Sequence, residues 1–471
     1  MNNLIYNSAL TLSSQIHEGR VSIPELMQAT LERIEKVNGA VNAIVSLADP
    51  DQLMAQAHAA QGLPRKGWLH GIPIAIKDLA NAADFPTSMG SSIFAGQMAK
   101  ADDLAVARIR AAGAIVIGKT NTPEFGLGSH TFNPVFGATK NPYDQSKSAG
   151  GSSGGAATAL ATGMVSVADG SDMMGSLRNP AAWNNVYGMR PTFGLVPSEP
   201  QGDTFLHQLA TNGPMARNPS DLAALLDTMA GIDPRQPMGI DQAPSLQSIK
   251  VDISGRQIGW LGDWGGAFEY ETGIESLSVS ALTQMEDLGL KVSEVATPFS
   301  AQAIWESWTT LRSFAVAMGM APLYENPEQR RQLKPAALYE IERGLMLNAS
   351  EVHKASVTRS LWFQKAAQLF ETYDVLALPS AQVWPFDVDL VHPETINDKP
   401  MDSYHRWMEV VIAAGLLGLP VVNVPIGFGT DNGLPMGLQL IGKRGADREL
   451  LQIAMVWHEA TNWPDIRRPS L

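Results

Sequence analysis

The chain has 471 residues, of which 45% are hydrophobic and 17% are charged, and its formal net charge is −13. This length provides for a large buried core and is compatible with two to three domains or with one large α/β domain. The negative charge, with no cluster of five or more basic residues to offset it, argues against nucleic-acid binding. The chain has no cysteine, which excludes disulfides, thiol nucleophiles and cysteine-ligated metal sites.

The N-terminal part predicts a helix packed on a core. Residues 22–25, Ser-Ile-Pro-Glu, combine a capping-box pattern with a proline in the first turn. Apolar residues then recur at helical spacing as far as Val37, and Gly39 is expected to end the helix. The first ten residues lack a basic segment followed by an apolar run, so we expect no signal peptide.

The next part of the chain has the pattern of two parallel strands joined by a helix. Two short apolar runs, residues 72–76 and 114–120, predict buried strands, and between them Asp103 opens a helix that Gly113 closes. Continuous apolar strands of this kind are typical of a parallel sheet. The Gly-, Asn- and Pro-rich loop that follows, residues 121–144, has the length of loops that often carry function.

The remaining chain predicts further strands and helices, without repeats or low-complexity segments. Residues 235–260 carry Pro, Gly, Asp and Gln and are expected to form a connector, whereas residues 265–372 have a mostly helical pattern. We also expect a short helix at 156–163, strands at 165–168, 374–380 and 421–429, and a closing helix at 445–461.

The stretch most similar to a membrane span is residues 410–427. A spanning helix needs about 20 apolar residues, and this stretch is shorter and is interrupted by Pro420, Asn423 and Pro425. A buried helix, a turn at Pro420 and a buried strand explain it better. We therefore expect a cytoplasmic protein with no membrane association.

Three polar features follow predicted strands: Lys77, the serines of residues 148–155, and Ser176. Ligands of parallel α/β sheets bind outside the carboxyl ends of the strands, so one site could contain all three. Lys77 is either a strand-end lysine that reaches solvent or a buried, neutral lysine that serves as a base. Lowering a lysine pKa from about 10.4 to about 7 costs roughly 4–5 kcal/mol, which a protein accepts only at a working site.

The stretch SAGGSSGGAATAL, residues 148–160, has several interpretations. It is not a phosphate-binding P-loop, because Ala156 stands where that motif needs a lysine, and it is too short for a linker. Residues 151–155 match the nucleophile elbow G-x-S-x-G, with Ser153 at the reactive position. An elbow needs a preceding strand and a downstream acid and histidine, and the preceding NPYDQSKSA has no strand pattern.

Residues 170–182, GSDMMGSLRNPAA, form the third feature. A glycine-containing loop before a helix can direct several backbone N–H groups at one point, and such donors can stabilise an oxyanion. The alternative is an ordinary helix start, with Pro180 in its first turns. The pattern alone leaves both interpretations open.

Together these segments resemble the amidase signature family of serine hydrolases, over nearly the whole chain. The similarity lies in GIPIAIKD, in SKSAGGSSGGAATAL, in GSDMMGSLRNPAAWNNVYGMRPTFGLVP, and in the C-terminal GLPVVNVPIGFGTDNGLPMGLQLIGKRGADRELLQIA. The resemblance implies an α/β fold with a large mixed, mostly parallel central sheet covered by helices on both faces. It implies a single domain over residues 1–471, with an N-terminal helical region at 1–65, a catalytic core at 66–230, a substrate-covering helical region at 265–372 and a C-terminal part of the core at 373–471.

The resemblance also implies a catalytic triad. Lys77 would be the general base, Ser152 a bridging serine that follows a cis peptide bond, and Ser176 the nucleophile. Ser153 would then be a supporting neighbour of Ser152. The N–H groups of Met173, Met174, Gly175 and Ser176 would form the oxyanion hole, Asp172 and Arg178 would brace this loop, and Gly126 would contact the substrate.

The sequence departs from the family at one position. Two glycines usually precede the nucleophile, and here the run is Met173–Met174–Gly175. Methionine keeps its N–H group, but it would be strained if the position needs a positive φ. Alternatively, the two thioether side chains line the acyl pocket. A similar run occurs in the branch that contains hydrolases of the nylon oligomer 6-aminohexanoate cyclic dimer.

The resemblance implies an amide hydrolase without a cofactor or metal, acting through a serine acyl-enzyme on a small-molecule amide. An apolar acyl, aryl or aliphatic amide or an oligoamide is expected, and Trp305, Trp308 and Phe314 are either pocket walls or core residues. Three alternatives remain: the amidotransferase component of a tRNA-dependent glutamine-forming complex, a carbamate or ester hydrolase, and an inactive binding module. The presence of all three triad residues argues against the last. A homodimer is left open as the oligomeric state.

Overall fold

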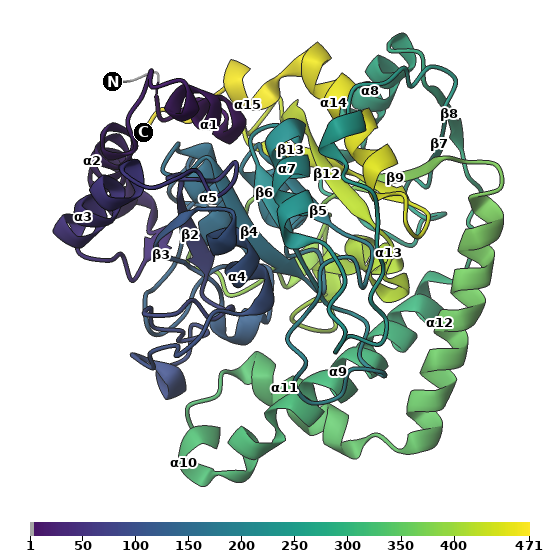
Figure 1. The fold of residues 1–471 in the computed structure, drawn as a ribbon. Helices are drawn as coiled ribbons and strands as arrows, with labels where there is room; N and C mark the ends of the chain where they lie inside the picture. Colours follow the sequence, from purple (N-terminus) through teal and green to yellow (C-terminus); the bar gives the residue numbers. More distant parts are fainter. Residues whose placement is uncertain (1–3) are drawn as a thin grey trace.

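The computed structural model describes residues 4–471. Its strands form an eight-stranded sheet, a three-stranded sheet and a small two-stranded ribbon, β10 (Thr395–Ile396) with β11 (Lys399–Pro400). Figure 1 shows the three-stranded sheet beside the β4 edge of the larger sheet. The expected mixed α/β fold is confirmed.

The larger sheet has the strand order β4-β6-β5-β12-β13-β9-β7-β8. Within this sheet every pairing from β4 to β9 is antiparallel, and only its last two described pairings, β9–β7 and β7–β8, are parallel. The prediction of a mostly parallel sheet is therefore wrong. A strand that is buried on both faces is continuously apolar whichever way it runs, so the pattern does not report direction. The strands are β4 (Val167–Asp172), β5 (Tyr187–Arg190), β6 (Thr211–Ala216), β7 (Gln257–Trp260), β8 (Lys291–Glu294), β9 (Val375–Pro379), β12 (Val421–Phe428) and β13 (Pro435–Gly442).

The smaller sheet confirms the predicted strand–helix–strand unit. β2 (Pro73–Lys77) and β3 (Ile115–Thr120) are parallel, and α4 (Leu104–Ala111) connects them. β1 (Ile44–Val45) pairs with β3 in the antiparallel sense. β2 lies next to β4, and the Lys77 N–H donates to the Asp169 carboxylate on β4 at 2.9 Å. This contact joins the two sheets at the residue predicted to be the base.

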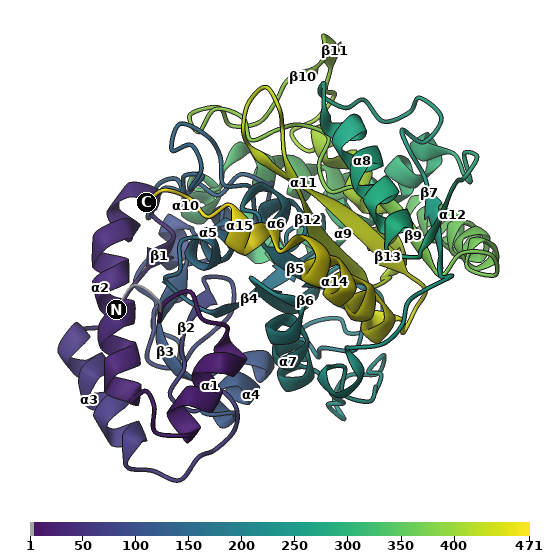
Figure 2. The ribbon, with the colours of Figure 1, turned by 90° about the horizontal axis from the view of Figure 1, so that it is seen from above.

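Helices cover both faces of the larger sheet, as expected. A Cβ added at Gly437 of β13 would meet Ala182 on α6 (Asn179–Trp183), whereas one added at Gly442 would meet Leu450 on α14 (Asp447–Thr461). Positions 437 and 442 are five residues apart, so they point to opposite faces of the strand. α6 and α14 therefore pack on opposite faces, and Figure 2 shows α14 running across β12 and β13.

The N-terminal helices are α1 (Ala9–His17), α2 (Ile23–Val41) and α3 (Pro50–Gln61). The predicted capping box is present: Ser22 and Glu25 bond each other's backbone N–H groups. Gly39 does not end α2, because the helix continues to Val41 and Asn42 ends it in the left-handed region at φ 52°. The prediction was wrong here because asparagine also adopts this conformation at helix ends.

The predicted helical region contains α8 (Ile274–Asp287), α9 (Ala301–Glu325), α10 (Pro327–Arg330), α11 (Pro335–Met346) and α12 (Ala349–Leu369). α9 packs against both α11 and α12, and Figure 1 shows these helices together along one side of the molecule. The preceding connector at 235–260 is irregular except for a 3₁₀ turn at Leu246–Ser248 and for its last four residues, which form β7 and which the prediction missed. Four residues are too few for a periodicity to show.

The apolar stretch at 410–427 forms the expected buried helix, turn and buried strand, but the turn lies at Gly418 rather than at Pro420. A short 3₁₀ segment and α13 (Ile412–Leu417) are followed by a turn at Gly418 and by the buried strand β12. The remaining helices are α5 (Gly154–Ala161), α7 (Pro219–Met229) and α15 (Trp463–Ile466). Within residues 4–471, no helix combines the length and the apolar character that a membrane crossing requires.

Candidate active site

The three predicted triad residues come from three separate elements. Lys77 is the last residue of β2, Ser152 lies two residues before α5, and Ser176 lies between β4 and α6. No strand precedes the glycine–serine stretch, so the strand–turn–helix context of a nucleophile elbow at Ser153 is absent from this part of the structure. The peptide bond between Gly151 and Ser152 is cis, as the resemblance implied.

Lys77 is buried among hydroxyl groups. Lys77 is only 1% exposed to solvent, which excludes the interpretation that it is a strand-end lysine reaching solvent. The ammonium nitrogen Nζ lies 2.8 Å from the Oγ atoms of Ser152 and Ser153. It lies 3.1 Å from Oγ of Ser171 on β4. Among residues 4–471, Lys77 Nζ therefore has three hydroxyl partners and no carboxylate within ion-pair distance.

Burial lowers the pKa of Lys77 to about 7, although the negative charges of Asp169 and Asp172 partly oppose this shift. Desolvation disfavours the charged form of a lysine, which is the cause expected for a side chain enclosed in protein. A large fraction of Lys77 is thus neutral near neutral pH. A neutral amine can accept a proton from a hydroxyl group within hydrogen-bond distance.

The glycines of this stretch permit close packing. A Cβ at Gly155 would overlap the backbone nitrogen of Asn121 and would lie 2.6 Å from the carbonyl oxygen of Ala43. α5 is therefore packed directly on the backbone of β3 and β1, which fixes Ser152 and Ser153 beside β2.

Asp172 organises the loop that leads to Ser176. Its carboxylate accepts hydrogen bonds from the N–H groups of Gly175 (2.9 Å) and Leu177 (3.1 Å). It also forms ion pairs with the buried guanidinium groups of Arg178 (3.0 Å) and Arg190 (3.3 Å). Burial would raise the pKa of Asp172, but the two arginines hold it well below its usual range. Asp172 is therefore ionised, and Arg178 pairs with it as the predicted brace.

One of the four predicted oxyanion donors already has an acceptor within the protein. The Gly175 N–H donates to Asp172 and so is not free for a substrate. Across residues 4–471, the N–H groups of Met173, Met174 and Ser176 donate to no protein acceptor. The physical reason is local: the Asp172 carboxylate stands three residues earlier and accepts this N–H across the turn. Three of the four predicted donors are thus free of protein acceptors in this part of the structure, and their role stays a prediction.

The double methionine carries no backbone strain. Gly175 is the residue in the left-handed region, and neither Met173 nor Met174 is among the described residues with positive φ. Met174 is buried in the core at 4% exposure, whereas Met173 is partly exposed and contributes to a pocket wall. The alternative in which methionine lines the pocket therefore holds for Met173 only.

Ser152 and Ser176 line one cavity of about 330 Å³. Gly126 and Met173 line it too, and Ser153 is not among its lining residues. Trp305 and Trp308 are also not among them, because both are buried in the core against His405. The walls are largely apolar and are made by Leu79, Met89, Phe125, Leu127, Ala210, Ala315, Val316 and Met320.

The Amidase family profile matches residues 25–451. The chain belongs to this family. Hydrolysis of amide bonds is therefore its reaction class, and the lysine, the serines and the cavity are considered below as parts of an amidase.

Two curated relatives cover the chain almost completely. An acylamidase of Rhodococcus erythropolis is 31% identical over 481 residues, which cover 99% of this chain and 98% of that protein. A glutamyl-tRNA(Gln) amidotransferase subunit of Alkaliphilus metalliredigens is 33% identical over 464 residues, 92% of each chain.

Solved amidase structures are similar over the whole fold. A bacterial aryl acylamidase of the amidase signature family superposes with a TM-score of 0.91 at 26% identity, covering 98% of this chain and 97% of that one. A 6-aminohexanoate cyclic dimer hydrolase superposes with a TM-score of 0.87 at 25% identity, covering 99% of each chain.

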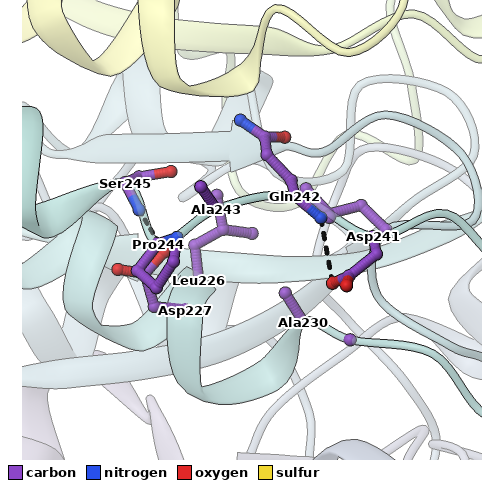
Figure 3. A pocket seen from close by; sticks show the side chains of 10 residues that line it. Leu226, Asp227, Ala230, Asp241, Gln242, Ala243, Pro244 and Ser245 are labelled. Carbon is purple, nitrogen blue, oxygen red and sulfur yellow. Dashed lines mark hydrogen bonds between the residues drawn. The ribbon is translucent and has the colours of Figure 1, made fainter.

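A larger hollow of about 480 Å³ lies beside α7, away from these residues. Figure 3 shows its lining, in which Ser245 donates its N–H to the Asp227 carboxylate at 2.7 Å and Gln242 donates to Asp241 at 3.0 Å. Its acidic groups are thus engaged with backbone N–H groups. It contains none of the predicted site residues, so volume alone does not locate the active site of this amidase.

Two polar residues of the cavity, Ser171 and Arg312, were not predicted from the sequence. Ser171 was missed because the strand was expected to end at residue 168, whereas β4 continues to Asp172. Had the strand been extended, the alternation of side chains would have put Ser171 on the same face as Asp169, toward Lys77. Arg312 lies on α9 and reaches the cavity from a distant part of the sequence, and no local pattern marks it.

Proposed function

We propose that the protein hydrolyses small, largely apolar amides through an acyl-enzyme on Ser176, with Lys77 as the base and Ser152 as the proton relay. The observation that carries this proposal is the 2.8 Å contact between Lys77 Nζ and Ser152 Oγ, at the wall of the cavity that Ser176 also lines. Lys77 is buried there with its pKa lowered to about 7. A shifted lysine next to a hydroxyl in a cavity is the environment expected of a working base.

The proposed reaction uses the three residues in turn. Ser176 gives its proton to Ser152, Ser152 gives its own proton to neutral Lys77, and Ser176 Oγ bonds to the amide carbon. The relay then returns a proton to the amine nitrogen as the C–N bond breaks. Water hydrolyses the resulting ester and restores the Ser176 hydroxyl, so the net products are a carboxylate and an amine.

The N–H groups of Met173, Met174 and Ser176 are the proposed oxyanion donors. They stand in the loop that Asp172 and Arg178 hold in place, and their hydrogens are free of protein acceptors among residues 4–471. A fixed donor of this kind contributes on the order of 10²–10³ in rate. Gly126 and Met173 would contact the bound substrate.

The substrate class is inferred from the cavity and the relatives. Apolar walls and a volume of about 330 Å³ favour a small acyl or aryl amide over a charged one. The acylamidase relative and the aryl acylamidase structure support the same class. Esters and carbamates of similar shape would be cleaved by the same acyl chemistry.

The test is a panel of acyl anilides, aliphatic amides, esters and carbamates, assayed with the wild type and with single serine variants. Ser176→Ala should lose hydrolysis by about 10³-fold or more, as expected for removal of a nucleophile. Ser153→Ala is the matched control: it removes a hydroxyl that also contacts Lys77 but does not line the cavity. Full activity of Ser176→Ala, together with a loss in Ser153→Ala, would overturn the assignment.

The 33% identity to an amidotransferase component favours a second function, release of ammonia from glutamine for a tRNA-bound partner reaction. Glutamine carries an ammonium and a carboxylate, which would need charged partners. The charged residues of this cavity, Asp172 and Arg312, are already paired with Arg178 and Glu340, which argues against glutamine as the substrate. Hydrolysis of simple amides by the purified chain alone would support the amidase function. Activity only with ATP and a partner protein would support the amidotransferase function.

A further inference from the structure

A buried polar cluster borders the cavity and contacts the loop that leads to Ser176 through Met173. Arg312 of α9 is 3% exposed and lines the cavity, and its Nε donates to the Glu340 carboxylate of α11 at 2.7 Å. Its Nη2 donates to the hydroxyl of Tyr404 at 2.9 Å. Its Cζ lies 5.0 Å from the centre of the Trp308 ring. These contacts hold one guanidinium group in a fixed orientation.

The third nitrogen of the Arg312 guanidinium, Nη1, has only a weak hydrogen-bond acceptor. Nη1 points at the thioether sulfur of Met173, 3.0 Å away. A guanidinium group has five N–H donors, and a thioether sulfur is a poor acceptor. Met173 is flexible, unbranched and partly exposed at the cavity wall. A stronger acceptor that enters the cavity can therefore take the place of the sulfur at little cost.

The cluster is neutral overall. Burial would raise the pKa of Glu340, but the charge of Arg312 and the hydrogen bond from the Ser313 hydroxyl at 2.6 Å hold it below its usual range, so the carboxylate is ionised. Burial would lower the pKa of Arg312, but Tyr404 and Glu340 raise it, so the guanidinium is charged. The pKa of Tyr404 is raised and that of His405 is lowered, chiefly by burial, which leaves both uncharged at neutral pH. The positive charge of Arg312 is balanced by the carboxylate at 2.7 Å.

We propose that Arg312 is a specificity-determining residue that binds an uncharged oxygen acceptor on the non-reacting part of the substrate, with Met173 acting as the displaceable occupant of that position. The favoured substrates are then amides that carry a second carbonyl, ether or nitro oxygen. A carboxylate would be disfavoured, because it would bring a second negative charge to a buried guanidinium that Glu340 already neutralises. This inference rests on the proposed function, since the cavity is taken to be the amide site.

The test uses two series of anilides, with the variable group on the acyl ring in one and on the amine ring in the other. The group is acetyl, isopropenyl or carboxylate; the first two have the same shape, and only acetyl has an acceptor oxygen. In the wild type, kcat/KM for acetyl should exceed that for isopropenyl by about tenfold or more in at least one series, as for a hydrogen bond from a charged donor. The carboxylate should be the poorest substrate.

Three variants separate the explanations. Arg312→Met should bring the acetyl-to-isopropenyl ratio to about one. Met173→Leu preserves volume and the Arg312–Glu340 pair but removes the competing sulfur, so the ratio should rise a few-fold. Glu340→Gln removes the balancing charge and should raise the relative kcat/KM of the carboxylate. Only Arg312→Met and Glu340→Gln disturb the buried pair, so Met173→Leu gives an answer even if the other two fold poorly.

The proposal is overturned if the wild type does not discriminate acetyl from isopropenyl in either series, if carboxylate is preferred, or if Met173→Leu leaves the ratio unchanged or lower. Dissociation constants of the same anilides for Ser176→Ala protein, measured by calorimetry, separate this outcome from failure of the proposed function. If the Ser176→Ala protein still hydrolyses the anilides but binds the acetyl compound more tightly than the isopropenyl compound, the mechanism is contradicted and the role of Arg312 is not. If the Ser176→Ala protein loses hydrolysis but binds the acetyl and isopropenyl compounds equally well, only the role of Arg312 is contradicted.

Discussion

At the scale of single residues, the site depends on the protonation state of Lys77. Its neighbours at Nζ are the hydroxyls of Ser152, Ser153 and Ser171, and its nearest charges are Asp169 and Asp172, which raise a pKa that burial lowers to about 7. A shift of this size from 10.5 corresponds to roughly 5 kcal/mol of lost stability while the unfolded chain keeps its lysine charged. This loss of stability occurs at the residue that the sequence analysis identified as the candidate base.

The first prediction is the pH profile. Only neutral Lys77 accepts a proton, so kcat/KM should rise about tenfold per pH unit below pH 7 and level off above it. Asp169→Asn keeps an acceptor for the Lys77 N–H but removes a charge that favours the ammonium, so the midpoint should move to lower pH. Rates measured over a pH series that brackets the Lys77 midpoint check both. A midpoint that stays fixed in Asp169→Asn would show that another group titrates.

A second prediction concerns stability at alkaline pH. Between pH 7 and 10.5 the unfolded chain binds one more proton at Lys77 than the folded chain does, so this group alone makes unfolding harder as pH rises, by up to about 1.4 kcal/mol per unit. Lys77→Met lacks this contribution. The melting temperature of the wild type relative to Lys77→Met should therefore rise as the pH increases through this window. A constant difference over the window would mean that Lys77 stays charged in the folded protein.

At the scale of elements, the sequence predicted the strands and helices that carry the site but not all of their ends. The capping box of α2 and the βαβ unit of β2, α4 and β3 follow from local patterns. Among the misplaced ends, Asn42 rather than Gly39 ends α2, and β4 continues to Asp172. The second error hid Ser171. Both ends are set by contacts outside the segment, where local periodicity has no information.

Two helical glycines form a matched pair for testing how the elements pack. A Cβ at Gly155 in α5 would strike the backbone of β3 and β1, whereas one at Gly39 in α2 would meet nothing within 4 Å. Gly39→Ala should raise stability by about 0.5–1 kcal/mol, because alanine loses less backbone entropy. Gly155→Ala should lower both the melting temperature and activity, since α5 and Ser152 would move away from Lys77. Equal effects of the two substitutions in calorimetry would contradict the close packing of α5.

At the scale of the whole molecule, the site is assembled from distant parts of the chain. Arg178 bonds Asp172, the Val411 carbonyl at 2.8 Å and Gln439 at 2.8 Å, so one side chain ties β4 to the segment before α13 and to β13. The resemblance identified Asp172 and Arg178 as braces, but no pattern in the sequence reports their partners. The strand directions were mispredicted for the same reason, because burial and not direction sets the apolar pattern. The predicted subdivision into regions remains a prediction.

The hydrogen bonds and ion pairs around Asp172 and Arg178 lead to a prediction about the stability of the whole molecule. Asp172→Asn keeps the shape but removes the negative charge between Arg178 and Arg190, both fully buried. Leaving buried charges unpaired costs about 3–5 kcal/mol, so the melting temperature should fall clearly, and kcat should fall because the loop before Ser176 loses its anchor. Asp233→Asn is the control, since Asp233 pairs with a largely exposed arginine and should change the melting temperature little. A variant at Asp172 as stable as this control would refute the bracing role.

The most direct test of the mechanism is to trap the acyl-enzyme. The protein is incubated with an activated aryl ester or a fluorophosphonate, and the modified residue is located by mass spectrometry of proteolytic peptides. The peptides around Ser152, Ser153, Ser171 and Ser176 are compared in the wild type and in Ser176→Ala. The mechanism predicts one adduct, on Ser176, which is absent from Ser176→Ala. An adduct on Ser153 or Ser171, or one that persists in Ser176→Ala, would contradict it.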